Sequence, residues 1–314
     1  MKGVIFSAKG KNTFSNKQLN LLTSLSEITF YEVKSQLDSQ KLFEVIQDND
    51  FAALTPRSYS RLSKEQIQAL RLKAIHLPTT GIHWFEPERF NNIDISFVPN
   101  FSSIACAEFT WSLILLMIRS HQSFLSSYNL DLHASKPGIE LAGKTLGIWG
   151  LGNIGKRVAK YANCFEMEVL GYDKENKEIN GVKQVSLEEM LEKSDIITIH
   201  IPINKSNHKI INKEIIDKLK EKTVLINTSR PKLMDYKALE EGLKNSKLKA
   251  VAIDKGYETQ DKFRHLLKYD NFVLTPHISW YTRESIEREI NGWFENIYSW
   301  LAGKPINIYN GQYY

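Results

Sequence analysis

The chain has 314 residues, which is enough for two domains with separate hydrophobic cores. Its 42% hydrophobic and 25% charged residues are typical of a globular protein and argue against a disordered or fibrous one. The net charge of +5 comes from scattered lysines and arginines, so it indicates a solvated surface without a nucleic-acid partner, and it would suit a small anionic ligand.

The cysteines and the apolar runs bear on location. Cys106 and Cys164 lie in apolar stretches without a CxxC motif, which predicts buried, reduced thiols, no metal site and a cytoplasmic protein. The apolar run at the start is too short for a signal peptide. The segment Ile104–Ile118 is about 15 residues long and contains Glu108, so it predicts a buried helix rather than a membrane span.

The first hundred residues alternate between strand and helix patterns. The predicted strands are residues 3–7, 28–33, 51–54, 73–77 and 95–98, and the predicted helices are residues 16–24, 38–47 and 63–70. This alternation predicts a parallel α/β sheet. The turn that contains Thr80 and Gly81 comes directly after a strand, at the end where such sheets bind ligands.

A long apolar helix, residues 102–120, is expected to lead into a second domain and to bury part of its surface against a neighbouring domain or subunit. There a strand at 145–149 is followed by Gly150, Gly152 and Gly155, a helical pattern, a second strand and Asp173.

This arrangement predicts a dinucleotide site. Gly150 would form the tight turn, Gly152 would let the backbone approach a pyrophosphate, and Gly155 would let the helix pack on the strand. The amides near Asn153 and Ile154 would face the phosphates. Asp173, the acid after the second strand, can bind the ribose hydroxyls and repels a 2′-phosphate, which favours NAD over NADP. The neighbouring Lys174 leaves NADP open.

The rest of this domain repeats the α/β alternation. The predicted helices are residues 186–192, 212–219 and 236–243, and the predicted strands are residues 195–200, 223–227, 250–254 and 272–275. A final helix, residues 282–301, has its apolar residues on one face and is expected to return the chain to the first domain. We therefore predict a substrate domain of residues 1–100 and 286–314, and an NAD-binding Rossmann domain of residues 101–285 inserted into it.

Several segments together resemble the D-isomer-specific 2-hydroxyacid dehydrogenases. They are LAGKTLGIWGLGNIG, SDIITIHIP, LINTSRPKLMDYKALEEGL and NFVLTPHIS, with SFVPNFSSIACAEFTWSLIL upstream, and they cover nearly the whole chain in the family's order. The resemblance implies two doubly wound, Rossmann-like parallel-sheet domains, with the NAD domain inserted into a flavodoxin-like substrate domain, and a homodimer.

The resemblance also assigns catalytic roles. His277 matches the acid/base histidine, and Arg230 matches the arginine that holds the carboxylate and carbonyl oxygens of the substrate. The family pairs its histidine with a glutamate five residues after the aspartate that corresponds to Asp254. Here the nearest glutamate is Glu258, four residues after it, so a one-residue deletion would be needed to bring its carboxylate to the histidine.

Further positions are carried over for binding. On the cofactor side the matching residues are His200, Pro202, Thr228, Ser229, Arg230, Asp254 and His277, and on the substrate side they are Arg57, Thr80, Gly81 and Arg230. Asp254 matches the position that orients the nicotinamide carboxamide. His200 can equally be a packed core residue, and the aromatic residues Trp84, Trp280 and Tyr281 can line the substrate site or simply pack.

The chain departs from the family pattern mainly on the substrate side. The differing positions are Arg230-Pro231, Asp254-Lys255, Pro99-Asn100 and the turn Thr79–His83. The first expectation is an NAD-dependent reductase of a small 2-oxo acid that gives the D-2-hydroxy acid. The alternatives are an enzyme of the same fold acting on a non-standard anion, such as formate, phosphite or a secondary-metabolite acid, and a non-catalytic NAD(H)-sensing protein.

Overall fold

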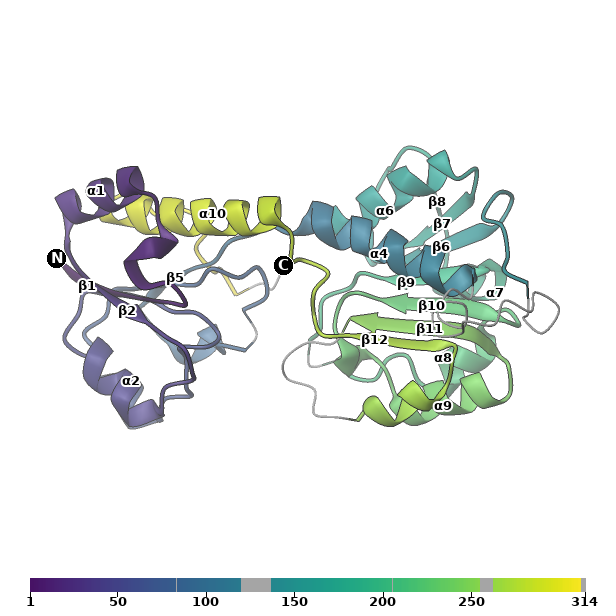
Figure 1. Cartoon of the computed structure of the whole chain (residues 1–314), viewed down its shortest axis with the longest axis horizontal. Helices are drawn as coiled ribbons and strands as arrows, with labels where there is room; N and C mark the ends of the chain where they lie inside the picture. The colour runs from purple at the N-terminus through teal and green to yellow at the C-terminus, as the bar shows by residue number, and fades with distance from the viewer. Residues whose placement is uncertain (83, 120–136, 205, 255–261, 312–314) are drawn as a thin grey trace, which may run out of the picture. The chain divides into compact units, whose positions relative to one another are not determined.

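The structure is a computed structural model that describes residues 1–82, 84–119, 137–204, 206–254 and 262–311 (Figure 1). The chain divides into two compact units. The first consists of Met1–Ser102 and Thr282–Tyr314, and the second, Ser103–Tyr281, is inserted between these segments. The chain passes from one unit to the other after Ser102 and again before Thr282, each within a few residues of the boundary predicted from the sequence.

The first unit is built on a five-stranded parallel sheet of order β2-β1-β3-β4-β5. Its strands are β1 (Lys2–Ser7), β2 (Glu27–Glu32), β3 (Phe51–Ala53), β4 (Ala74–His76) and β5 (Asp94–Ser96). Its helices are α1 (Asn16–Leu25), α2 (Ser39–Ile46), α3 (Lys64–Ala69) and α10 (Arg283–Leu301), with the 3-10 turns η1 (Gly10–Thr13) and η2 (Pro87–Arg89). This strand order is the flavodoxin-like one, as predicted.

The helix α10 completes the first unit although it comes from the far end of the chain. It lies beside α1 on one face of the sheet, and α2 covers the other face (Figure 1). The indole of Trp293 donates to the carbonyl of His76 at 3.0 Å, and the amide of Asn296 donates to the carbonyl of Phe97 at 2.8 Å. These bonds join the helix to backbone groups at the ends of β4 and β5, so this unit requires both segments of the chain.

The second unit has a seven-stranded parallel sheet of order β12-β11-β10-β9-β6-β7-β8. Its strands are β6 (Thr145–Trp149), β7 (Glu168–Tyr172), β8 (Lys183–Gln184), β9 (Ile196–Ile199), β10 (Thr223–Asn227), β11 (Leu248–Asp254) and β12 (Phe272–Thr275). Its helices are α4 (Ser103–Ile118), α6 (Asn153–Cys164), α7 (Leu187–Lys193), α8 (Lys213–Lys218) and α9 (Tyr236–Lys244), with η3 (Pro231–Leu233) and η4 (Arg264–Lys268). If β6 is counted as strand 1 and the sheet is read from β8 toward β12, the order begins 3-2-1-4-5-6. This is the order of the dinucleotide-binding fold.

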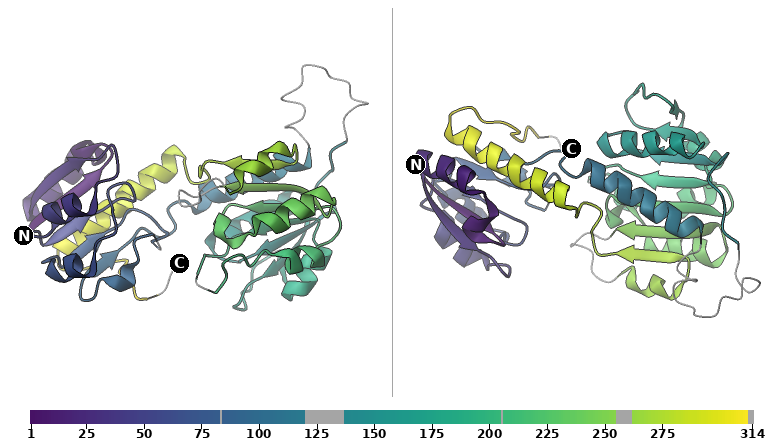
Figure 2. Two further views of the ribbon diagram at one scale, coloured as in Figure 1. Left: turned by 90° about the horizontal axis from the view of Figure 1, so that it is seen from below. Right: turned by 45° about the horizontal axis from the view of Figure 1, so that its top comes forward.

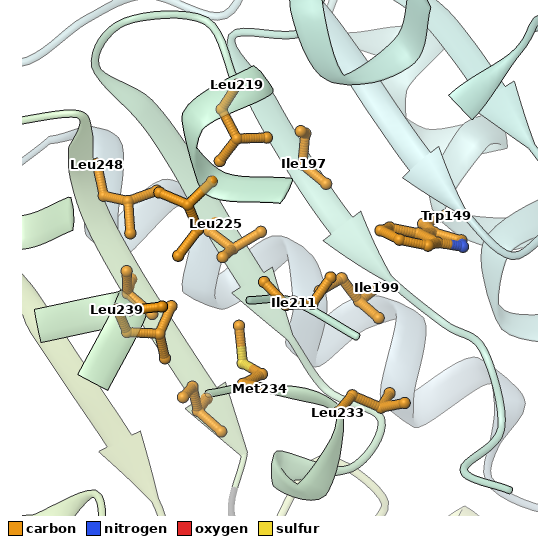
Figure 3. Packing of buried hydrophobic residues seen from close by; sticks show 14 of the residues in the cluster. Trp149, Ile197, Ile199, Ile211, Leu219, Leu225, Leu233, Met234, Leu239 and Leu248 are labelled. Atoms are coloured by element: carbon orange, nitrogen blue, oxygen red, sulfur yellow. The ribbon is translucent and has the colours of Figure 1, made fainter. Parts of the chain in front are cut away.

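Each face of this sheet is covered by its own set of helices. Alternate residues of one strand enter different cores: Ile197 and Ile199 belong to the core under α7, α8 and α9, which Figure 3 shows, whereas Ile196 belongs to the core under α4 and α6. Figure 2 shows α4 and α6 together on their face of the sheet. Because both faces are buried, the central strands are apolar at nearly every position, as in IITI of β9.

Three details differ from the sequence expectations. The short edge strand β8 was not predicted, since two residues carry no periodicity. Cys106 is buried as expected, but Cys164 is exposed because it lies at the end of α6, off the face formed by Val158, Ala159 and Ala162. The helix α4 buries most of its circumference within its own unit.

Among the described residues, none forms a helix long and apolar enough to cross a bilayer.

Candidate functional site

The carboxyl edge of the second sheet gathers most of the predicted site residues. Since neighbouring strands are parallel, the carboxyl ends of β12, β11, β10, β9 and β6 lie side by side at one edge, together with the loops that follow β12, β10, β9 and β6. In that order, these loops or strand ends carry His277, Asp254, Arg230, His200 and Gly150.

The glycine turn after β6 has the geometry that its sequence predicts. Gly150 has φ +103°, which favours glycine, and a Cβ there would lie 2.8 Å from the backbone carbon of His200. A Cβ on Gly155 would lie 2.0 Å from the carbonyl oxygen of Gly150, so this position also requires glycine. Gly152 differs, because a Cβ there would meet no atom within 4 Å. Open space beside the turn is what a closely approaching ligand needs.

The start of α6 lies in this open space. Gly152 is its N-cap residue, and no side chain caps the helix. The amides of a first helical turn have no acceptor within the helix, and the helix dipole favours an anion there. The turn therefore fits a pyrophosphate bound through backbone groups.

Asp173 follows β7 and connects the second strand to the glycine turn. Its carboxylate accepts hydrogen bonds from the amides of Leu151 at 2.7 Å and Glu175 at 3.1 Å, and from Lys177 Nζ at 3.0 Å. Burial raises the pKa of this carboxyl, but the hydrogen bonds and the lysine charge outweigh burial and lower it overall. Asp173 is therefore an ionised acid that holds the turn directly.

His200 follows β9, and its backbone lies beside Gly150 of the glycine turn. Its amide donates to the carbonyl of Trp149 at 2.7 Å. In the described part of the chain, neither of its buried ring nitrogens has a hydrogen-bond partner. Burial lowers the pKa of the ring to about 3, so the imidazole is neutral near pH 7. His200 therefore keeps hydrogen-bonding capacity that none of the described residues uses.

The loop after β10 is organised by the buried side chain of Asn227. Its oxygen accepts from the amide of Ser229 at 2.9 Å, and its nitrogen donates to the carbonyl of Arg230 at 3.0 Å. The next residue, Pro231, takes the first position of η3, where no amide donor is needed. The proline after Arg230 is therefore accommodated by a short helical turn that begins directly after the arginine.

The turn after β12 is held by Asp254, which is fully buried. The carboxylate accepts from the hydroxyl of Thr275 at 2.6 Å and from the amides of Ile278 and Ser279, both at 2.9 Å. Between these donors lies His277, whose φ of +62° is rare for a residue with a side chain. Asp254 thus holds the backbone directly after the histidine and the Thr275 side chain before it, so the carboxylate fixes the turn.

The helix α4 contacts both the turn after β12 and the loop after β10. Cys106 Sγ donates to the hydroxyl oxygen of Ser279 at 3.6 Å. One helical turn later, the hydroxyl of Thr110 lies 2.9 Å from that of Thr228. The buried face of α4 thus supports both the histidine turn and the arginine loop.

The first unit presents its own candidate site, at the carboxyl ends of the adjacent strands β3 and β4. Arg57 is exposed in the turn after β3. After β4, the Thr80 hydroxyl donates to the carbonyl of Val98 at 2.8 Å. Within the described residues, the amides of Thr80 and Gly81 donate no hydrogen bond, so both remain available to an anion.

The turn that carries these amides is held by an aromatic cluster. The Trp84 indole donates to Thr79 Oγ1 at 3.2 Å, and that hydroxyl donates to the carbonyl of Gly81 at 3.2 Å. The ring of Trp84 also packs edge-on against Tyr59, which follows the Arg57 turn. Trp84 therefore packs, and it also links the two loops.

Three positions discussed from the sequence lie outside the described residues. They are Glu258, Lys255 and His83. Sequence reasoning missed Lys177, Asn227, Cys106, Thr110 and the Trp84–Thr79 bond. The only signal for Lys177 was that it is a basic residue four positions after Asp173. The remaining contacts are not encoded by any motif.

The strand order, the glycine turn and the acid after β7 together define the second unit as a dinucleotide-binding Rossmann domain. Comparison with known proteins gives the family. The family model described as "D-isomer specific 2-hydroxyacid dehydrogenase, NAD binding domain" matches residues 111–279. The chain belongs to this family, and its second unit is an NAD-binding domain.

Individual relatives agree with this assignment. A D-3-phosphoglycerate dehydrogenase of Methanocaldococcus jannaschii is 36% identical over 271 residues, and the match covers 83% of this chain and 51% of that protein. A hydroxypyruvate reductase of Blautia hydrogenotrophica is 28% identical over 305 residues, covering 92% of this chain and 94% of that one. The structure of a D-lactate dehydrogenase of Aquifex aeolicus with NAD and lactic acid is 26% identical, covers 96% of each chain and has a TM-score of 0.78. The chain thus spans about half the length of the archaeal D-3-phosphoglycerate dehydrogenases that it matches.

Proposed function

We propose that the protein interconverts a small 2-oxo acid and the corresponding D-2-hydroxy acid by hydride transfer with NAD(H). The observation that carries the proposal is the order of groups along the edge of the second sheet, from the Asp254-anchored turn of His277, past Arg230, to the glycine turn. Such a row can place an acid/base group and a cation beside the reactive end of a dinucleotide. Relatives named for hydroxypyruvate, glyoxylate and phosphoglycerate support this substrate class.

The cofactor would be held by the second unit. The turn of Gly150, Gly152 and Gly155 would bind the pyrophosphate, and Asp173 would accept hydrogen bonds from the ribose hydroxyls. The nicotinamide would lie toward Thr228, Ser229, His200 and Pro202, and Asp254 retains acceptor capacity on Oδ2 for its carboxamide. The bound nicotinamide supplies or accepts the hydride.

The substrate would be held by cations and amides. Arg230 would bind the carboxylate and the carbonyl oxygen through paired hydrogen bonds. Arg57 and the free amides of Thr80 and Gly81, in the substrate domain, would bind the carboxylate. His277 would donate a proton to the carbonyl oxygen during reduction and accept it during oxidation, with Glu258 as its proposed partner.

His277→Asn tests the catalytic part of this proposal. With NADH and a panel of 2-oxo acids that includes hydroxypyruvate, glyoxylate and 3-phosphohydroxypyruvate, wild-type protein should oxidise NADH and form the D product. In the variant, kcat should fall by about 10²–10⁴ while NADH affinity is retained, because only proton transfer is removed.

A variant with unchanged kcat would exclude His277 as the acid/base group. Wild-type protein that binds NADH tightly but turns over no acid would favour an NAD(H)-sensing role instead. Turnover of formate or phosphite with NAD would indicate a non-standard anion as the substrate.

We also propose that the protein is a cytoplasmic homodimer. The outer side of α4 exposes Leu115, and the neighbouring end of α6 exposes Phe165, each at 37%. Apolar side chains gathered on adjacent helices favour contact with a second copy. Light scattering on the purified chain tests the dimer, and a monomeric mass at micromolar concentration would refute it. The free thiols Cys106 and Cys164 suit a reducing compartment, which cell fractionation tests.

A further inference from the structure

The acid expected to bind the ribose carries its own counter-ion. Lys177 Nζ lies 3.0 Å from Asp173 Oδ2 and 3.5 Å from Glu175 Oε2. The side chains of the Asp173–Lys177 pair are only 15% and 25% exposed. Because the pair is shielded from solvent, its attraction is screened less than that of a surface pair.

The backbone around the lysine is fixed from the neighbouring strand. Gln184 of β8 accepts a hydrogen bond from the amide of Lys177 at 2.8 Å and donates one to the carbonyl of Glu175, also at 2.8 Å. The amide of Glu175 in turn donates to Asp173. The segment is therefore a closed loop that keeps the ammonium group beside the carboxylate.

The charges of this segment decide which nucleotides it can accept. A lone carboxylate at this position accepts ribose hydroxyls and repels a 2′-phosphate, which carries a charge of about −1.5 to −2 near pH 7. Here Lys174 and Lys177 accompany the acids Asp173 and Glu175, and Glu178 follows, so the two lysines offset two of the three carboxylates. Of the two lysines, the structure places Lys177 on the carboxylate, and Lys174 is exposed.

We propose that Lys177 sets the dinucleotide selectivity of the domain. Its ammonium group offsets the charge of Asp173 and can pair with a 2′-phosphate, so that the domain binds NADP(H) as well as NAD(H). The inference rests on the dinucleotide site of the proposed function, but it needs neither the substrate nor the catalytic residues.

The experiment measures dissociation constants of NADH and NADPH by calorimetry on the full chain, without substrate. Wild-type protein should bind both nucleotides. Lys177→Met should weaken NADPH by at least about tenfold and change NADH by less than about threefold, because only the 2′-phosphate loses a partner. Lys177→Arg keeps the charge and should retain NADPH binding.

Lys174→Met is the matched control, since it removes one positive charge from an exposed neighbour. It should change either affinity by less than about threefold, because an exposed charge is screened by water and salt. Thermal unfolding of each variant shows that the fold is kept.

Three results would overturn the inference: wild-type protein that binds NADH but not NADPH, an unchanged NADPH affinity in Lys177→Met, or an equal loss in Lys174→Met. Wild-type protein that binds neither nucleotide would refute the dinucleotide site itself. A chain that binds both nucleotides but reduces no acid would refute only the catalytic proposal.

Discussion

The carboxyl edges of the two sheets hold their loops by different means. In the second unit, buried polar side chains do this work: Asp254 and Asn227 bond to the backbone of the turns that carry His277 and Arg230. In the first unit, the turn of Thr80 and Gly81 is held by hydroxyl bonds and an aromatic cluster.

This difference suits different tasks. Buried carboxylate and amide groups fix backbone atoms in one arrangement, because each unsatisfied partner would cost about 1–3 kcal/mol. Aromatic rings and hydroxyls accept changes of neighbouring residues more easily. Departures from the family pattern occur in both units, at Arg230-Pro231 and Asp254-Lys255 in the second and at Pro99-Asn100 and Thr79–His83 in the first. Buried polar groups therefore hold the altered turns of the second unit, whereas hydroxyls and aromatic rings hold the altered turn of the first.

The largest expected effect comes from the glycine turn. Gly155→Val would put side-chain atoms onto the carbonyl of Gly150, so the second unit should lose about 3 kcal/mol or more of stability and its NADH binding. Gly152→Ala is the contrasting variant, because its Cβ enters open space. It should unfold like wild type and yet bind NADH at least about tenfold more weakly, if a phosphate lies against that residue.

Urea unfolding and calorimetry measure the two effects separately. Normal NADH affinity in Gly152→Ala would show that the pyrophosphate does not approach this glycine. Normal stability in Gly155→Val would show that β6 and α6 do not pack as described.

Acid should weaken both units for the same reason. Burial lowers the pKa of His76 in the first unit, and that of His200 in the second, to about 3 from 6.5. Both rings stay neutral in the folded protein but take up a proton when it unfolds below pH 6.5. Stability is therefore fully present above pH 6.5 and falls toward pH 3, by about 1.4 kcal/mol per pH unit for each histidine, or about 2 kcal/mol at pH 5.

His76→Asn separates the two contributions. The asparagine amide can replace the contact of His76 Nδ1 with Ser96 Oγ, which measures 2.7 Å, but it does not titrate. Hydrogen exchange of β4 and β9 amides at pH 7 and pH 5 reports on each unit. In the variant, the β4 amides should no longer lose protection between pH 7 and pH 5, whereas the β9 amides should still lose it. If the β4 amides lose as much protection as in wild type, the acid sensitivity of the first unit belongs to another group.

The smallest expected effect concerns the substrate side. Trp84→Phe keeps a ring against Tyr59 but removes the donor to Thr79. A lost hydrogen bond of about 0.5–1.5 kcal/mol should raise KM for the acid about two- to tenfold, with kcat and NADH affinity nearly unchanged. Trp84→Leu also removes the ring and should have the larger effect. If kcat falls instead of KM rising, the turn acts on catalysis rather than on binding.

Much of the fold could be predicted because its signals are local. Apolar runs and glycine spacing predicted the strands, helices and glycine turn within a few residues. The strand β8 was missed because two residues carry no pattern, and Cys164 was wrongly placed inside because its burial depends on how α6 faces the sheet.

The candidate site could be predicted only in part. Motifs pointed to Gly150, Asp173, Arg230 and His277 because each lies in a short, characteristic segment. No motif could show that Lys177 neutralises Asp173, since that contact depends on Gln184 of an edge strand.

By itself, then, the sequence determined the α/β class, the inserted dinucleotide domain and the residue types at the sheet edges. These follow from periodicity and glycine placement, which act over a few residues. Only the tertiary structure decided that Asp254 holds the histidine turn, that α4 supports two loops and that Asp173 has a lysine partner. Each of these contacts joins residues from different strands or helices, and a hydrogen bond or ion pair between them exists only once the sheet has set their distance.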